Sequence, residues 1–165
     1  MLLPIVTDPN PILHQESKPL SVEEIKSDKI QKLIKQMIPT MYLKDGVGLA
    51  APQVGESIQI FVLHKNHITE PSLASNDALV IINPNWKPAS RWKEWDEEGC
   101  LSVPYTYGQV KRYKKITVEG LDRNGNPIKF EATNFFARII QHETDHLHGI
   151  LFTAKAKGLR QIKPE

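Results

Sequence analysis

Residues 141–149 read QHETDHLHG, with two histidines, His142 and His146, four positions apart and Glu143 directly after the first. On an α-helix these histidines lie about 40° apart around the axis and one turn apart along it, so both imidazoles can reach one cation. Glu143 then lies at their flank, where a carboxylate can bond a metal-bound water and leave the metal to other ligands. The pattern predicts a helix that supplies two ligands of a catalytic metal site.

The residues around this motif predict that its helix is buried. Thr133 or Asn134 can cap its start and Gly149 suits its end. Apolar residues lie along one side between these positions: Phe135, Phe136, Ile139, Ile140 and Leu147. A chance grouping of polar residues on a solvated helix is the alternative. Buried histidines and glutamates need partners, which favours the metal site.

The remaining segments predict a mixed fold. Ser21 and Glu24 form a capping-box pattern, and apolar residues then recur at helical spacing over residues 28–42. Apolar and β-branched runs predict strands at 57–64 and 78–82, and an extended stretch at 108–121 leads through Asn124-Gly125 into 127–132. We therefore expect an α+β fold in which antiparallel sheets pack around the metal-binding helix, with another helix nearer the N-terminus.

Length and composition fit one globular domain over residues 1–165, since 40% of the residues are hydrophobic and 24% are charged. The chain has neither a signal-like start nor eighteen consecutive apolar residues, so we expect a soluble, cytoplasmic protein that does not bind membranes. A net charge of +2 argues against direct nucleic-acid binding. The basic run at 111–115 is expected to be a solvated strand, and Trp86, Trp92 and Trp95 to form a satellite core.

The third ligand has to come from upstream of the helix. The chain after His146 has neither the third histidine of metzincin peptidases nor the helix-borne glutamate of thermolysin-like ones. Upstream candidates are a carboxylate or one of four side chains: His14, His64, His67 and Cys100. Cys100 is favoured because Gly99 lets the backbone approach a metal and the thiol binds as a thiolate. The histidines at 14, 64, 67 and 148 are then expected on the surface.

Three motifs, in this order, resemble those of the peptide deformylase family over nearly the whole chain: GVGLAAPQ at 46–53, EGCLS at 98–102 and QHETDH at 141–146. The resemblance implies that Cys100, His142 and His146 hold one metal ion. It also implies Fe²⁺ as the cofactor, with Zn²⁺ or Ni²⁺ as substitutes. The implied partners are N-formylmethionyl peptides and nascent chains, which lose their formyl group as formate.

The resemblance also implies roles for other residues. Glu143 would move the water proton to the departing amine, while the Gln53 amide and the Leu101 backbone N–H would stabilise the developing oxyanion. The methionine side chain would enter an apolar pocket beside the helix, formed by Val47, Phe135 and Ile139. Gly46 and Gly48 would let the peptide backbone approach, or merely form a turn. Gln141 and Asp145 would orient the ligands or form structural pairs, and Glu98 would pair with Arg112.

Two other functions fit the same motifs. One is a small metallopeptidase, and the other is a deformylase-like domain with a structural metal, which Glu143 and Gln53 disfavour because a structural site closes with a fourth protein ligand. The chain also departs from the family pattern. The loop at 65–77 is longer than in compact members, and Tyr107 stands where many bacterial members have arginine. The tail TAKAKGLRQIKPE replaces a long basic helix that docks on the ribosome, so only weak ribosome association is expected.

Overall fold

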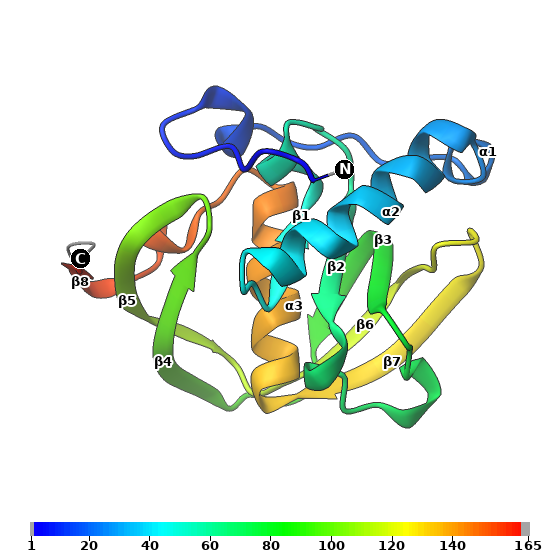
Figure 1. The fold of residues 1–165 in the computed structure, drawn as a ribbon. Coiled ribbons are helices and arrows are strands. Elements are labelled where there is room, and N and C mark those ends of the chain that lie inside the picture. The colour runs from blue at the N-terminus through cyan, green and yellow to red at the C-terminus, as the bar shows by residue number, and fades with distance from the viewer. Residues whose placement is uncertain (1, 163–165) are drawn as a thin grey trace.

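Two antiparallel sheets form most of the computed structural model, which describes residues 2–162 (Figure 1). The larger sheet has the strand order β1-β2-β3-β6-β7 and the smaller one the order β4-β5-β8. The strands are β1 Gly48–Ala50, β2 Ile60–His64, β3 Ala78–Pro88, β4 Lys93–Cys100, β5 Val103–Tyr113, β6 Lys115–Leu121, β7 Pro127–Thr133 and β8 Lys157–Gln161. The expected class, a mixed fold with antiparallel sheets and few helices, is confirmed.

The helices occupy distinct places relative to the sheets. A short helix α1, Val22–Ile25, precedes α2, Asp28–Leu43, and both have serine caps at their starts. Helix α3, Asn134–Leu147, runs between the two sheets (Figure 1). Short 3₁₀ turns complete the chain: Pro11–His14, Ala51–Val54, Lys65–His67, Pro71–Leu73 and Phe152–Ala154. In α3 every residue from Phe136 to Leu147 is buried, so its polar residues need partners inside the protein.

The larger sheet is covered on both faces, which explains its continuous apolar strands. Ile60 and Val62 of β2 pack into the core cluster that contains the apolar face of α2. Phe61 and Leu63, which point to the opposite face, pack into the cluster that contains Phe136 and the other buried apolar residues of α3. The sheet therefore anchors α3 through one face and α2 through the other.

Strand boundaries differ from those expected. The strand expected at 57–64 begins at Ile60, and the one expected at 78–82 continues to Pro88. The stretch expected as one strand at 108–121 is two strands in different sheets, β5 and β6, which meet at Lys114. Alternate residues are buried on both sides of Lys114, so hydrophobic periodicity alone could not reveal the change of sheet. Strand β4 was not expected at all, because most of its residues are charged or exposed.

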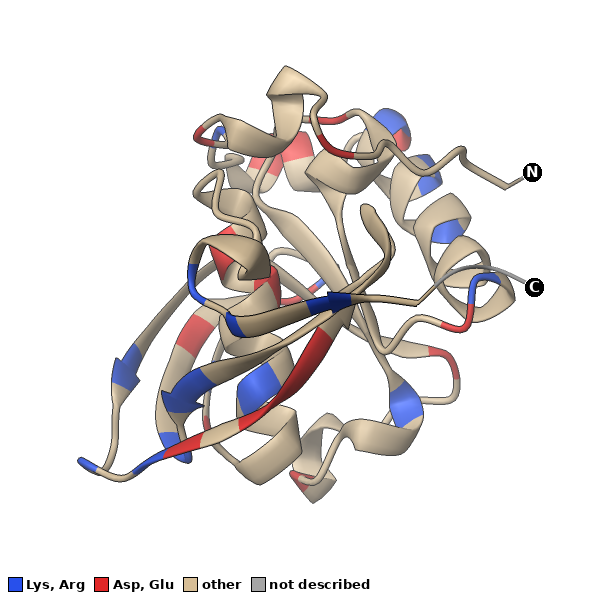
Figure 2. Ribbon diagram, turned by 90° about the vertical axis from the view of Figure 1, so that its left-hand side faces the viewer, with Lys and Arg blue, Asp and Glu red and all other residues tan. Residues whose placement is uncertain are grey.

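The surface expectations need two corrections. Arg112, within the basic run at 111–115, is buried, whereas Lys111 and Lys114 are exposed. Trp92 and Trp95 are not a satellite core, since they are 63% and 42% exposed, and only Trp86 packs against a core cluster. Figure 2 shows basic and acidic residues close together on the strands of the smaller sheet. That mixture agrees with the small net charge of +2.

The ends of α3 are set by backbone geometry. Thr133 is the N-cap residue but its side chain makes no capping bond; the Asn134 N–H instead donates to the Lys114 carbonyl at 2.8 Å. At the other end Gly149 has φ +73°, and the Ile150 N–H returns to the Asp145 carbonyl at 2.9 Å. A Cβ at residue 149 would lie 2.6 Å from the His14 carbonyl carbon. Only glycine fits this position.

Among residues 2–162, none of the helices combines the length and the apolar character that crossing a bilayer requires.

Gly149→Ala should strongly destabilise the protein for two reasons. The new methyl group would meet the backbone of His14, and alanine would have to adopt the positive φ of this position. We expect a loss of at least about 3 kcal/mol in the free energy of unfolding. Gly158→Ala is the matched control, since Gly158 also has a positive φ, +64°, but a methyl group added there would meet open space among the described residues. It should cost only about 1–2 kcal/mol. Urea unfolding curves compare the two, and equal losses would contradict the steric argument.

Candidate metal and catalytic site

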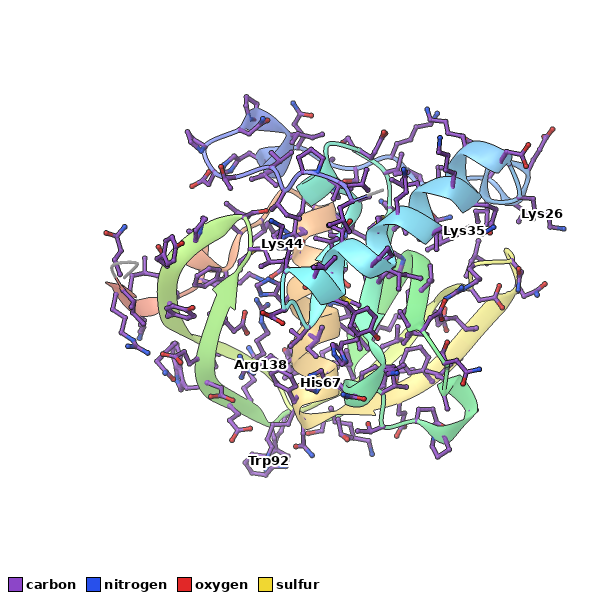
Figure 3. The ribbon with its side chains drawn as sticks, in the orientation of Figure 1. Lys26, Lys35, Lys44, His67, Trp92 and Arg138 are labelled. Atoms are coloured by element: carbon purple, nitrogen blue, oxygen red, sulfur yellow. The ribbon has the colours of Figure 1, made fainter. Side chains whose placement is uncertain are left out.

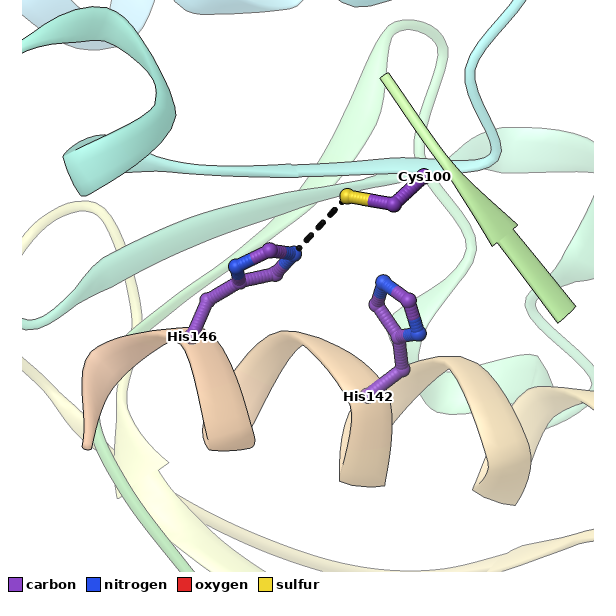
Figure 4. Close-up of side chains that lie close together, drawn as sticks. All are labelled: Cys100, His142 and His146. Atoms are coloured by element: carbon purple, nitrogen blue, oxygen red, sulfur yellow. Dashed lines mark hydrogen bonds between the residues drawn. The ribbon is translucent and has the colours of Figure 1, made fainter. Parts of the chain in front are cut away.

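The two histidines of α3 and the cysteine at the end of β4 meet in one place. His142 and His146 lie one turn apart, and Cys100 follows a shift of register between β4 and β5. One potential ligand atom from each of the three residues lies within 4.8 Å of the others. The Cys100 Sγ is 3.3 Å from the His146 Nε2 (Figure 4). The fold thus brings together the three residues that the sequence motifs single out.

Glu98 sets the orientation of the His142 ring. Its Oε1 lies 2.8 Å from the His142 Nδ1, which leaves the Nε2 facing Glu143, whose Oε2 is 4.0 Å away. A carboxylate on one ring nitrogen fixes the tautomer and makes the other nitrogen a better ligand. The expected pairing of Glu98 with Arg112 is observed. Glu98 also orients the His142 ring through its bond to Nδ1.

Two arginines surround the Glu98 carboxylate. Arg112 donates from Nε at 2.7 Å and from a terminal nitrogen at 2.8 Å, and Arg138 donates at 2.6 Å. Burial would raise the pKa of Glu98, but the hydrogen bonds from Arg112 and His142 outweigh it, so this pKa lies well below its usual range. Glu98 therefore stays ionised in the protein interior.

Asp145 and Gln141 act at a distance from the three converging residues. Asp145 accepts from Arg112 at 2.8 Å and from Lys155 at 2.9 Å, so it is linked to His142 through Arg112 and then Glu98. Gln141 exchanges hydrogen bonds with the backbone of Tyr113, at 3.0 and 2.8 Å, and so ties α3 to β5. Its observed role is structural.

Burial shapes the acid–base properties of the other groups. Burial raises the pKa of Glu143 to about 7 and lowers the pKa of His146 below its usual value. For His142 burial opposes protonation, but the neighbouring Cys100 and Glu98 outweigh it and raise its pKa to about 10. Within residues 2–162, Glu143 Oε1 and His146 Nδ1 have no hydrogen-bond partner. The surroundings of His142 thus attract positive charge.

These features fit a divalent transition-metal ion. A thiolate and two imidazoles are ligands that zinc, iron and nickel accept, and three protein ligands leave one position open. The bond from Glu98 to the His142 Nδ1 leaves the Nε2 available as a ligand, as is common for metal-binding histidines. Glu143 lines the cavity beside these residues and has one buried carboxylate oxygen, Oε1, without a hydrogen-bond partner among residues 2–162, so it has an acceptor free for a water.

A cavity of about 750 Å³ opens beside this cluster. Its walls include residues proposed from the sequence for substrate and catalysis: Val47, Gly48, Gln53, Leu101, Phe135, Ile139 and Glu143. Ile139 is buried, whereas Val47 and Phe135 are 37% and 43% exposed. A Cβ on Gly48 would lie 2.8 Å from Glu143 Oε2. Glycine at residue 48 therefore lets β1 approach the carboxylate closely.

Gln53 is buried and held from two sides. Its Oε1 accepts from the Ala50 N–H at 2.9 Å, and its Nε2 donates to the Ser102 hydroxyl at 3.1 Å and approaches Cys100 Sγ at 3.5 Å. The amide nitrogen is thereby directed at the site. Leu101 follows Cys100 in the turn between β4 and β5 and lines the same cavity.

Sequence reasoning missed two residues of this site, Ser102 and Arg138. Ser102 is the last residue of the EGCLS motif, but nothing in the motif indicates that it receives the Gln53 amide. Arg138 bonds Glu98, the Val110 carbonyl and the Glu94 carbonyl, and so joins α3 to β4 and β5. An arginine among the apolar residues of a buried helix was the available signal, because a buried guanidinium needs an acceptor.

Comparisons with known proteins agree with this geometry. The family model described as polypeptide deformylase matches residues 2–161. Peptide deformylase 2 of Gloeobacter violaceus is 42% identical over 154 residues, which is 93% of this chain and 79% of the relative. The peptide deformylase of Symbiobacterium thermophilum is 42% identical over 164 residues, 99% of this chain and 71% of the relative.

Solved structures are similar over most of the chain. The peptide deformylase of Synechococcus elongatus, in complex with actinonin, gives a TM-score of 0.82 at 38% identity and covers 94% of this chain and 79% of its own. The Thermotoga maritima peptide deformylase gives 0.84 at 34% identity, with 95% and 99% covered. The chain therefore belongs to the peptide deformylase family, enzymes that remove the N-formyl group from newly made proteins.

Proposed function

We propose that this chain deformylates N-formylmethionyl peptides with one Fe²⁺ ion held by Cys100, His142 and His146. The observation that carries the proposal is the convergence of these three donors beside Glu143, on the wall of a cavity large enough for a side chain and part of a peptide. Iron is preferred by resemblance to the family. Zinc and nickel are proposed as substitutes because they accept the same thiolate and imidazole ligands.

The peptide is proposed to lie between two strand edges. Strand β1 is the end strand of the larger sheet and β4 is the end strand of the smaller one, and residues of both line the cavity. An extended peptide can form main-chain hydrogen bonds with such edges, which gives affinity without sequence preference. Gly48 on one edge and Gly99 on the other both line the cavity. Methionine would then enter between Val47, Phe135 and Ile139.

The chain's own groups then complete the chemistry. When bound, the ion would supply Lewis acidity that polarises the formyl carbonyl and lowers the pKa of a water towards about 7. Glu143 accepts the water proton as the oxygen adds to the formyl carbon, and passes it to the nitrogen as the C–N bond breaks. The Gln53 side-chain amide and the Leu101 N–H donate to the oxyanion. The products are formate and a free N-terminus.

The wider setting follows from the substrate class. Formylated nascent chains are proposed as the partners, and the cytoplasm as the place where the enzyme meets them. Any ribosome association is proposed to be weak, because residues 157–161 of the tail form strand β8 on the smaller sheet. Direct contact with nucleic acid or membrane forms no part of the proposal.

The purified chain, loaded with Fe²⁺ without oxygen, should release formate from formyl-Met-Ala-Ser and leave acetyl-Met-Ala-Ser intact. The reason is that Gln53, Leu101 and Glu143 converge beside space for one small carbonyl. Formate production and free amine should rise together in a coupled assay. Cleavage of internal peptide bonds at a comparable rate would favour a metallopeptidase, and metal binding without either reaction would favour a non-catalytic domain.

Glu143→Gln should keep the metal, because Glu143 is proposed to move a proton and to bind no ion. Its kcat should fall roughly 10²-fold or more. Cys100→Ala should lose the metal itself, because only two of the three proposed ligands, His142 and His146, remain. Metal content after dialysis, measured beside activity, separates the two effects. Full metal retention in Cys100→Ala would show that the ligand assignment is wrong.

The Fe²⁺ form should lose activity in air, whereas the Zn²⁺ form should persist. Oxygen can oxidise both ferrous iron and the Cys100 thiolate, and zinc has no redox chemistry. The zinc form should also turn over more slowly, because zinc has a stronger preference for four ligands when the formyl oxygen must join. Both forms are assayed on one formyl peptide with and without oxygen. An iron form that is air-stable and no faster would identify zinc as the better candidate for the native ion.

A further inference from the structure

The long loop after β2, residues 65–77, is hydrogen-bonded at both ends to one side chain, that of Tyr42. The Tyr42 hydroxyl on α2 donates to the Asp77 carbonyl and accepts from the Lys65 N–H at 3.2 Å. Arg123 holds the Asp77 carboxylate with two hydrogen bonds of 3.0 and 2.9 Å. The segment 65–77 is therefore packed against the protein at both of its ends.

The end of β2 and the start of this loop contact two apolar residues of the proposed methionine pocket, Val47 and Phe135. The His64 N–H donates to the Val47 carbonyl at 2.9 Å. The His67 ring packs edge-on against Phe135, with ring centroids 5.0 Å apart and an interplanar angle of 74°. Figure 3 labels His67 near the N-terminal turns of α3, where Phe135 lies. The last residue of β2 thus contacts the pocket at Val47, and the loop contacts it at Phe135.

A row of rings continues from this contact into the protein. His67 lies 5.3 Å from His64, and His64 lies 4.6 Å from Tyr42, measured between ring centroids. His64 and His67 are half-buried, so they reach the surface as expected but only in part. Burial, and then repulsion from His64, lowers the pKa of His67, which favours an uncharged ring against Phe135. Edge-to-face packing of this kind stabilises one orientation of both rings.

The packing of His67 limits the motion of the Phe135 ring, which is partly exposed. Phe135 is 43% exposed, whereas every later residue of α3 up to Leu147 is buried, and its side chain lines the cavity. An exposed aromatic ring that is free on one side can rotate away from the pocket, and a long flexible side chain would then lose contact area. A short side chain does not reach this wall and would lose little.

We propose that His67 is a positioning residue that holds Phe135 as a wall of the side-chain pocket and so sets the preference for long side chains such as methionine. This proposal rests on the proposed deformylase activity. It assigns to the loop a role in selecting the first residue of the substrate.

The test compares formyl-Met-Ala-Ser with formyl-Ala-Ala-Ser on the same metal-loaded preparation of His67→Ala. We expect kcat/KM for the methionine peptide to fall about three- to tenfold, mainly through KM, with little change for the alanine peptide. The ratio of the two values is independent of the amount of folded, metal-loaded enzyme. A general loss of stability therefore cannot produce the expected change in preference.

Two further variants complete the test. His67→Phe keeps an aromatic ring against Phe135 and should restore most of the preference for methionine. His14→Ala, which removes an exposed histidine paired with Asp8, is the matched control and should leave the ratio unchanged. An unchanged ratio in His67→Ala would overturn the role of His67. Failure of the unsubstituted chain to release formate would instead overturn the proposed deformylase activity, so the two failures are distinguishable.

Discussion

The site depends on one buried carboxylate, that of Glu98. It accepts hydrogen bonds from Arg112 of β5 and Arg138 of α3 and bonds His142 of α3, while its own backbone belongs to β4. A lone buried carboxylate would be costly, but each of its oxygens here has charged or polar donors. Because Glu98 is two residues from Cys100, the same contacts that compensate its charge also fix the distance between the thiol and the helix.

The arrangement also explains why the two sheets are separate. The larger sheet holds α3 through apolar packing, whereas the smaller sheet meets α3 through charged and polar contacts from Arg112, Arg138 and Gln141. Apolar packing places the helix, and the directional hydrogen bonds set its rotation relative to β4 and β5. Among the described residues, the end strands β1 and β4 remain unpaired on their cavity sides, which is the feature a peptide can use.

The sequence predicted the residues that converge at the site, and the features it failed to predict were missed for physical reasons. The helical spacing around His142 and the short EGCLS motif identified residues that converge in space. Strand β4 escaped notice because a charged edge strand has no hydrophobic periodicity. The change of sheet at Lys114 was hidden because burial alternates on both sides of it. Arg138 and His67 make their contacts with residues far away in the chain, which local patterns do not encode.

The charge of the interior is also a constraint on what the site can hold. Glu98 and Asp145 are paired with Arg112, Arg138 and Lys155, so their charges are compensated within the protein, whereas burial raises the pKa of the neighbouring Glu143 to about 7. Glu143 Oε1 and His146 Nδ1 are two of the three buried side-chain atoms without partners among residues 2–162, the third being Ser17 Oγ, and such atoms carry a cost in stability. Such costs persist where they serve a function, which is consistent with the proton-transfer role proposed for Glu143.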